Sequence, residues 1–125
     1  MRYKIIASGS KGNAVIIDKI LIDCGVPFKK IEPYLKEISL VLITHEHGDH
    51  LNINTALRLS TERPLLRFGG GNQIAAKLLA AGVKARQIDV LSPDITYDFG
   101  ICKVIPFEVP HDVRCFGFKI FAGGK

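Results

Sequence analysis

The sequence predicts an α/β fold built as layers around a mixed sheet. Two observations support this prediction: segments with helical and strand-like spacing of apolar residues alternate in the first half of the chain, and strand-like segments dominate the second half. The 125 residues are 47% hydrophobic and 23% charged, an ordinary balance for one globular domain. We therefore expect residues 1–125 to belong to a single domain.

The first 25 residues predict three short antiparallel strands. Strand-like runs lie at residues 3–7, 14–17 and 20–22. The sequence SGSKGN at residues 8–13 has the composition of a turn, and the third strand ends at Asp23, Cys24 and Gly25.

The next segment predicts a helix followed by a buried strand. Pro27 stands where a helix can begin, because apolar residues recur at helical spacing over residues 28–38. Pro33 interrupts that pattern and favours a second turn over one continuous helix. Residues 38–44 are almost all β-branched residues or leucine, which predicts a strand buried on both faces.

The rest of the chain predicts two more helices and several strands. Helices are expected at residues 51–59 and 73–81, the second capped by Asn72 and ended by Gly82. Gly69, Gly70 and Gly71 predict a flexible turn, with anion binding by their backbone amides as the less favoured alternative. Strands are expected at residues 64–68, 88–91, 95–99, 102–109 and 116–121.

Charge and cysteine content narrow the class of protein. Seventeen Lys and Arg against twelve Asp and Glu give a net charge of +5, which mildly favours anionic partners such as phosphates or nucleic acid. No signal peptide and no long apolar span is visible, so no membrane partner is expected. Cys24, Cys102 and Cys115 are far apart and predict small buried thiols in a reducing cytoplasm.

A histidine cluster carries the chemistry. Three of the four histidines fall within the sequence HEHGDH at residues 45–50. Imidazole nitrogens are common ligands of zinc, iron and similar ions, and a carboxylate adds charge and an oxygen donor. A chance run of exposed histidines is the weaker alternative, and the zincin motif fails because Asp49 stands where it needs a histidine. The cluster therefore predicts a divalent-metal site on His45, His47, Asp49 and His50.

The position of this cluster supports the same hypothesis. It follows the buried strand directly, and side chains alternate along an extended segment, so His45 and His47 project to one side. Gly48 can adopt a backbone conformation closed to other residues, which lets the chain bend so that Asp49 and His50 point back toward the site.

The HEHGDH sequence resembles the His-x-His-x-Asp-His signature of the metallo-β-lactamase superfamily. Three weaker motifs agree over nearly the whole chain: SGSKGN at residues 8–13, LIDCG at residues 21–25, and VPHD at residues 109–112 followed by FGF at residues 116–118. The first of these is similar to a turn in the branch that contains bacterial exonuclease-like proteins and cyclic phosphodiesterases.

This resemblance implies an αββα sandwich, with helices outside two sheets and two metals at the edge between the sheets. His45, His47 and His111 would hold one metal, and Asp49 and His50 the second. Asp23 would brace the loop that carries the ligands. Taken alone, His111 would be an ordinary surface or core histidine, and Asp23 would be an ordinary turn-capping residue.

The chain departs from the family pattern at its C-terminal end. The family continues with a strand that ends in a metal-bridging aspartate and, later, with a final histidine ligand, and neither follows before Lys125. We therefore expect residues 1–125 to be the N-terminal portion of a longer metallo-β-lactamase-like domain, in which the sandwich is incomplete.

The leading functional hypothesis is a metal-dependent hydrolase, a phosphodiesterase or nuclease whose substrate is a phosphodiester or nucleic acid. Its binuclear centre would use a metal-bound hydroxide, with Asp49 orienting the nucleophile and accepting its proton. Two zinc ions suit the ligands, as do manganese and iron. Lys11 either contacts a substrate phosphate or is simply solvated.

Two alternatives remain open. The same metals and fold can hydrolyse a small ester, lactone or amide, because one fold hosts many substrates. A chain without the later ligands can instead be a non-catalytic fragment or interaction module that keeps the metal motif. The sequence predicts no oligomeric state.

Overall fold

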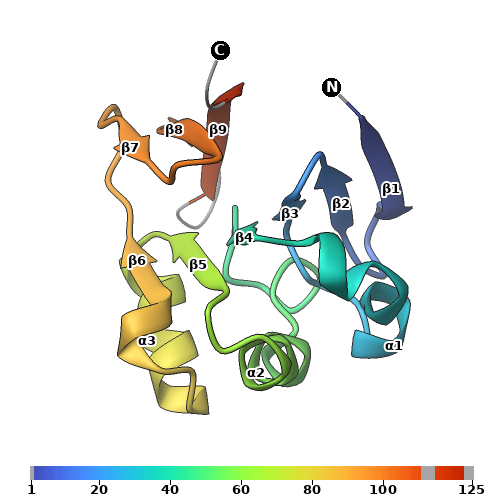
Figure 1. Ribbon diagram of the computed structural model, residues 1–125. Helices are drawn as coiled ribbons and strands as arrows, with labels where there is room; N and C mark the ends of the chain where they lie inside the picture. Colours follow the sequence, from blue (N-terminus) through green and yellow to red (C-terminus); the bar gives the residue numbers. More distant parts are fainter. Residues whose placement is uncertain (1, 111–114, 123–125) are drawn as a thin grey trace.

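The chain folds as a two-sheet sandwich with helices on one side (Figure 1). The computed structural model describes residues 2–110 and 115–122. The larger sheet has six strands in the order β1-β2-β3-β4-β5-β6, and the smaller has three in the order β7-β8-β9. Helices α1, α2 and α3 cover one face of the larger sheet, and the smaller sheet lies over its other face. This arrangement confirms the predicted α/β layers. Within the described residues, the outer face of the smaller sheet has no helix layer.

The strands and helices follow the sequence pattern closely. In the larger sheet, the strands are β1 (Tyr3–Ala7), β2 (Ala14–Ile17), β3 (Ile20–Ile22), β4 (Leu40–Leu42), β5 (Arg67–Gly70) and β6 (Ile88–Val90). In the smaller sheet they are β7 (Tyr97–Asp98), β8 (Cys102–Val109) and β9 (Cys115–Ala122). The α-helices are α1 (Phe28–Ile31), α2 (Ile53–Glu62) and α3 (Asn72–Ala81), and the 3₁₀ helices are η1 (Glu32–Glu37) and η2 (Ala85–Gln87).

The larger sheet is mixed. Strands β1, β2 and β3 pair antiparallel, as predicted from the first 25 residues. From β3 to β6 every pairing is parallel, because a helical connection returns the chain to the same end of the sheet each time. The carboxyl ends of β3 and β4 therefore meet at one edge of the sheet.

Strand β4 is buried on both faces, which confirms the prediction from its apolar sequence. Val41 packs into the core between the sheet and the helices. Leu40 and Leu42 point the other way, into the core between the two sheets. Burial on both faces makes β4 rigid. The strand therefore fixes the position of the segment that follows its carboxyl end.

The first helical segment divides at Pro33. Helix α1 ends at Ile31, and the 3₁₀ helix η1 carries the proline in its first turn. A proline has no amide hydrogen to donate and its ring collides with the preceding turn, so one continuous α-helix does not form.

No helix in the described part of the chain is long and apolar enough to cross a membrane.

The glycine run is where the sequence prediction was wrong. Gly69 and Gly70 belong to β5 and are buried, so they form no flexible turn. A Cβ on Gly70 would lie 2.8 Å from the Cγ2 atom of Ile74, so the strand needs the small size of glycine where α3 packs on it. Gly71 rather than Asn72 is the N-cap of α3, and no side-chain hydrogen bond caps this helix.

Other helix ends have clear local causes. Helix α2 begins at Ile53, two residues later than predicted, because Asn52 is its N-cap and accepts a hydrogen bond from the Thr55 amide at 3.2 Å. Helix α3 ends where predicted, at Gly82, whose φ of +110° is left-handed.

The three cysteines are free thiols, as predicted. Cys24 and Cys102 are buried, and Cys115 is half-buried. Burial raises the pKa of the Cys24 thiol to about 12, and the nearby Asp23 carboxylate adds to that shift. Burial also raises the pKa values of Cys102 and Cys115. Cys24 and Cys102 are therefore buried apolar packing groups, as predicted, whereas Cys115 is only half-buried.

Candidate metal centre

The histidine cluster lies where the two sheets meet. It leaves the carboxyl end of β4, and the amide of Phe116 on β9 donates to the carbonyl of Thr44 at 2.8 Å. His45 forms an isolated antiparallel bridge with Cys115, the first residue of β9. The cluster therefore starts from backbone that both sheets hold in place.

Three side chains of the cluster converge. His45, His47 and Asp49 each offer one ligand atom, and these atoms all lie within 4.8 Å of one another. His45 is buried, Asp49 half-buried and His47 exposed. Two atoms that share one ion through bonds of 2.0–2.2 Å are separated by at most about 4.4 Å. The three atoms are therefore near the spacing that a shared ion requires, and two imidazoles with a carboxylate are a donor set that fits a divalent transition metal.

His50 lies beside these three residues, with its ring centre 5.1 Å from that of His45. Its Nε2 atom lies 3.7 Å from Oδ2 of Asp49, and its Nδ1 atom lies 2.8 Å from Oδ2 of Asp23. When Nδ1 carries the proton and donates to Asp23, Nε2 keeps its lone pair for a metal. Asp49 thus lies close to both predicted ligand sets, and the division of the ligands between two metals remains a prediction.

Asp23 joins the end of β3 to the ligand loop. Its Oδ1 atom accepts the Thr44 amide at 2.7 Å, and its Oδ2 atom accepts the Thr44 hydroxyl at 2.7 Å in addition to His50. Burial raises the pKa of the Asp23 carboxyl, and the hydrogen bonds from His50 and Thr44 act against that rise. The side chain predicted to brace the loop is therefore in contact with it.

Asn13 ties the loop to the turn between β1 and β2. Its Nδ2 atom donates to the carbonyl of Asp49 at 2.9 Å and to the carbonyl of Gly9 at 3.0 Å. Its Oδ1 atom accepts the Gly9 amide at 3.1 Å, which holds the side chain in place. Sequence reasoning missed this residue, although it ends the SGSKGN motif. Lys11, in the same turn, is exposed, and its phosphate contact stays a prediction.

Close backbone packing fixes the far end of the loop. The amide of Cys24 donates to the carbonyl of His50 at 2.9 Å. A Cβ on Gly25 would lie 2.0 Å from the carbonyl oxygen of Asp49, so only glycine fits there. The LIDCG motif contained this signal, but only its aspartate was assigned a role from the sequence.

Glu46, between the first two histidines, is held by α3. The Nζ atom of Lys77 lies 3.4 Å from Oε2 of Glu46 and donates to its carbonyl at 3.2 Å. This contact turns the Glu46 carboxylate toward α3.

His111 lies outside the described residues, so its place in the ligand set stays a prediction.

Comparisons with known proteins agree with this architecture. The protein-family models that were compared give no match to the chain. The structure superposes on the metallo-β-lactamase fold protein YhfI from Bacillus subtilis with a TM-score of 0.73 and 19% identity, over 94% of this chain and 56% of that chain. It also superposes on the short form of human tRNase Z with a TM-score of 0.72 and 16% identity, over 96% and 63%.

The chain has the metallo-β-lactamase fold. Two sequence relatives are exodeoxyribonucleases. WalJ of Streptococcus pneumoniae serotype 2 (strain D39) is 42% identical over 62 residues, 41% of this chain and 23% of that protein. YycJ of Bacillus anthracis is 28% identical over 123 residues, 90% of this chain and 46% of that protein.

These matches define the relationship. The chain is distantly homologous to the two exodeoxyribonucleases over part of their length, and it spans about half or less of each. It likewise covers 56% and 63% of the two superposed metallo-β-lactamase-fold chains. The predicted resemblance is confirmed, and the chain accounts for part of the fold seen in these longer proteins.

Proposed function

We propose that this chain is the metal-holding part of a hydrolase that cleaves phosphodiester bonds in DNA. The observation that carries the proposal is the convergence of His45, His47 and Asp49 within 4.8 Å at the carboxyl end of a doubly buried strand. The distant homology to two exodeoxyribonucleases supports DNA as the substrate class.

The ligands would divide between two ions. His45 and His47, with His111, would hold one ion, and Asp49 with His50 would hold the second. When bound, such ions lower the pKa of a water molecule and offset the charge that develops on phosphate oxygens. Zinc, manganese and iron all suit imidazole and carboxylate donors.

The protein's own residues would orient the reactants. Asp49 carries a carboxylate beside the imidazoles, so it would position the attacking water and accept its proton. Asp23 would keep the Nδ1 proton of His50 in place, through the 2.8 Å contact. Lys11 would contact a phosphate of the substrate, since its turn is tied to Asp49 through Asn13.

Metal content is the first test. The chain, and the longer protein if the reading frame continues past Lys125, would be dialysed against metal-free buffer and their metal measured. We expect about two ions in the longer protein and one or none here. His47→Ala should lose metal and keep its fold, because the side chain is exposed. Asn54→Ala, exposed on α2, is the matched control and should change neither.

Activity is the second test. The longer protein, loaded with zinc, manganese or iron, would be given labelled DNA, a generic phosphodiester and a generic lactone. We expect cleavage of DNA and of the phosphodiester, with loss of both in His47→Ala. Turnover of the lactone alone would contradict the nuclease proposal and favour a small-molecule hydrolase. Absence of tightly held metal would contradict both kinds of metal-dependent hydrolase.

A further inference from the structure

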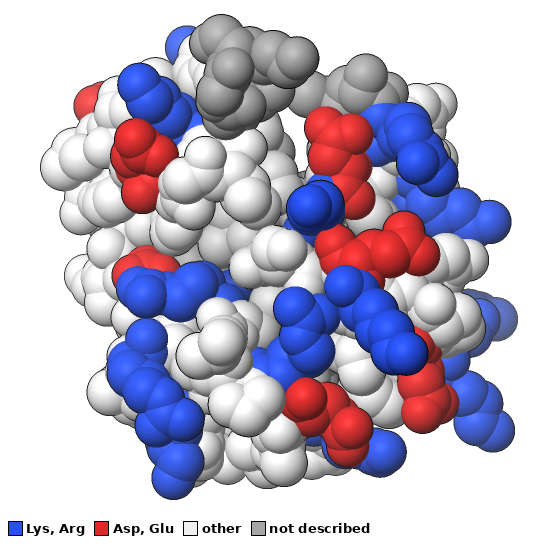
Figure 2. All heavy atoms as spheres, in the orientation of Figure 1, with Lys and Arg blue, Asp and Glu red and all other residues white. Residues whose placement is uncertain are grey.

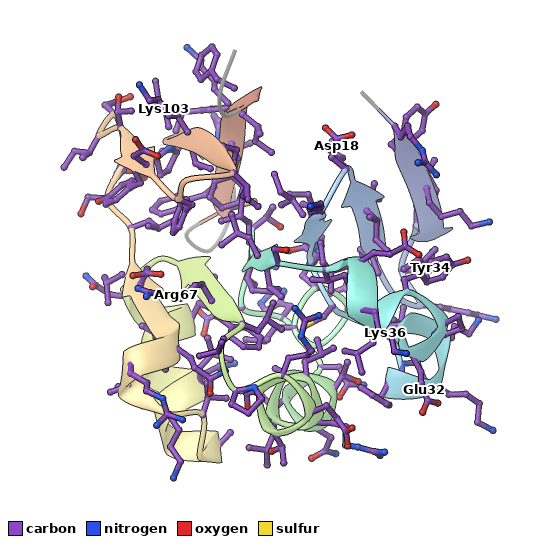
Figure 3. The ribbon with its side chains drawn as sticks, viewed as in Figure 1. Asp18, Glu32, Tyr34, Lys36, Arg67 and Lys103 are labelled. Carbon is purple, nitrogen blue, oxygen red and sulfur yellow. The ribbon has the colours of Figure 1, made fainter. Side chains whose placement is uncertain are left out.

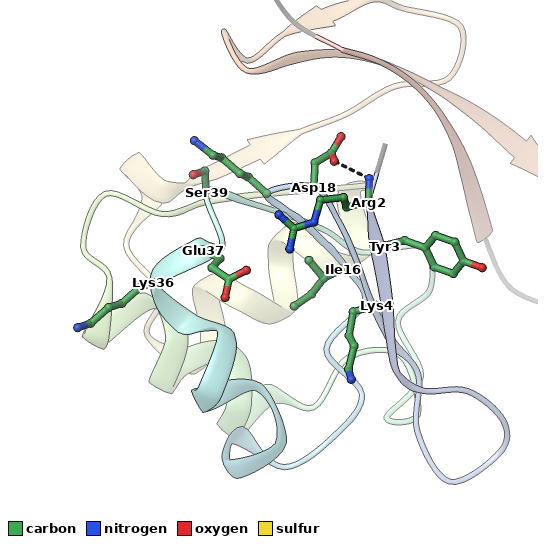
Figure 4. A pocket seen from close by; sticks show the side chains of 9 residues that line it. Arg2, Tyr3, Lys4, Ile16, Asp18, Lys36, Glu37 and Ser39 are labelled. Carbon is green, nitrogen blue, oxygen red and sulfur yellow. Dashed lines mark hydrogen bonds between the residues drawn. The ribbon is translucent and has the colours of Figure 1, made fainter.

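A pocket opens at the opposite end of β4 from the metal centre. It has a volume of about 490 Å³ and lies where β1, the turn between β2 and β3, and η1 come together (Figure 4). Four cationic side chains line it, Arg2, Lys4, Lys19 and Lys36, together with the carboxylates of Asp18 and Glu37. The volume falls in the range of small-molecule sites, about 300–1,000 Å³.

The pocket is positively charged. Four cations less two carboxylates leave an excess of two positive charges. Within the described residues, none of these four cations pairs with a carboxylate, whereas Arg58, Arg67 and Lys77 elsewhere each do. Asp18 already accepts the backbone amide of Arg2 at 2.9 Å, which uses part of its capacity. The cations are therefore available to an anion.

The walls of the pocket are fixed by secondary structure. Figure 4 shows Lys4 on β1 and Arg2 directly before it, and Figure 3 shows Asp18 on the β2–β3 turn and Lys36 on η1. The Nζ atom of Lys4 lies 6.0 Å from the centre of the Tyr34 ring, at the outer limit of a cation–π contact. Figure 2 shows basic and acidic side chains interspersed over this face of the molecule.

The residues on either side of β4 give the distance between the pocket and the metal centre. Ser39 lines the pocket and directly precedes β4, while His45 follows the same strand. Six residues of extended chain span about 20 Å. On one strand of B-DNA, where phosphates advance 3.4 Å each along the axis, that distance corresponds to roughly six phosphates.

We propose that this pocket is an accessory site for the phosphate backbone of DNA, engaged by the same molecule whose reacting phosphodiester lies at the metal centre. The ligand assignment rests on the proposed nuclease function. A backbone phosphate suits the pocket because it is anionic and is recognised by charge rather than by exact position. The DNA strand would extend from the metal centre, at the carboxyl end of β4, to the pocket at the amino end of β4.

The test compares two double variants with the same loss of charge. Lys19→Gln with Lys36→Gln removes two cations of the pocket. Lys84→Gln with Lys103→Gln removes two exposed cations that do not line it. Binding of a fluorescent 20-nucleotide DNA strand would be measured by anisotropy without divalent metal, at several salt concentrations.

We expect the pocket variant to bind DNA about five- to tenfold more weakly, and the control to change less than twofold. The slope of log affinity against log salt should become shallower by about 0.7 for each phosphate of a single strand that the variant no longer neutralises. Equal weakening in both variants would mean non-specific charge attraction and would overturn the proposal, as would unchanged binding in the pocket variant.

Substrate length separates this proposal from the proposed function. If both hold, the pocket variant should lose about fivefold in kcat/KM for a 20-nucleotide strand relative to a trinucleotide, which is too short to span both sites. If the metal centre cleaves no DNA, the metal-free binding difference still tests the pocket. Competition by inorganic pyrophosphate as strong as by DNA would assign the pocket to a small phosphate and would overturn the DNA assignment.

Discussion

The two ends of β4 hold their polar side chains in different ways. At the carboxyl end, Asp23 and His45 are buried, and Asp23 is hydrogen-bonded to both Thr44 and His50. At the amino end, Lys19 and Lys36 are exposed and pair with no carboxylate among the described residues.

This contrast matches the needs of two kinds of ligand. A metal ion requires several donors fixed to within a few tenths of an ångström, so its ligands need packing and hydrogen bonds around them. A phosphate chain is attracted over several ångströms by charge, so the cations that meet it gain little from being fixed. We therefore expect the carboxyl end to be sensitive to substitution and the amino end to be tolerant.

The largest effect is expected at Gly25. In Gly25→Ala the new Cβ would collide with the Asp49 carbonyl at 2.0 Å, so the ligand loop must shift, at a cost of about 3 kcal/mol in the free energy of unfolding. Gly48→Ala is the matched control, because a Cβ there meets no atom of the described residues within 4 Å. Urea unfolding followed by circular dichroism measures both, and equal stability of the two variants would contradict the close packing.

A somewhat smaller loss is expected at Asp23. Asp23→Ala leaves the Thr44 amide, the Thr44 hydroxyl and the His50 ring without their acceptor, which should lower the free energy of unfolding by about 2–3 kcal/mol. Metal affinity should fall about 10- to 100-fold, because the ring of His50 loses its orientation. Titration with zinc measures the second effect. Asp18→Ala, exposed at the amino end, should leave metal affinity unchanged.

Asn13 should have an intermediate effect. Asn13→Ala removes the donor to the Asp49 carbonyl and the link to Gly9, which should lower stability by about 1–2 kcal/mol. The control Asn54→Ala lies on the exposed face of α2 and should change stability by less than about 0.5 kcal/mol. Thermal unfolding of the pair gives the comparison, and a neutral Asn13→Ala would show that the β1–β2 turn does not support the loop.

The smallest effect is expected at the amino end. Lys36→Gln removes an exposed cation that pairs with no carboxylate in the described part of the chain, so the free energy of unfolding should change by less than about 0.5 kcal/mol. Denaturant titration against the unsubstituted protein checks this. A loss above about 1 kcal/mol would mean that Lys36 has a structural partner, and the contrast between the two ends of β4 would then be wrong.

Much of the fold followed from local sequence. The pattern of apolar residues predicted strands at β1, β2 and β3 and a doubly buried strand at β4. The structure confirms all four. Gly82 ends α3 because glycine, which has no Cβ, adopts a left-handed φ at little steric cost. Pro33 divided the first helix for the same local reason.

The glycine run shows the limit of local reasoning. Gly69 and Gly70 look like a turn in the sequence, because glycine favours turns when nothing else is known. In the structure they are strand residues against which Ile74 packs, so their role depends on a neighbour that composition does not reveal.

The metal-ligand candidates and the rigid strand before them could be predicted from the sequence, because both lie within one short segment. The groups that hold those candidates in place became visible only in the folded chain. Asn13 meets Asp49 across 36 residues, and Asp23 meets His50 across 27. Lys19 and Lys36 share a pocket only because β3 and β4 pair in parallel. Such meetings depend on sheet order and register, and one-dimensional spacing contains neither.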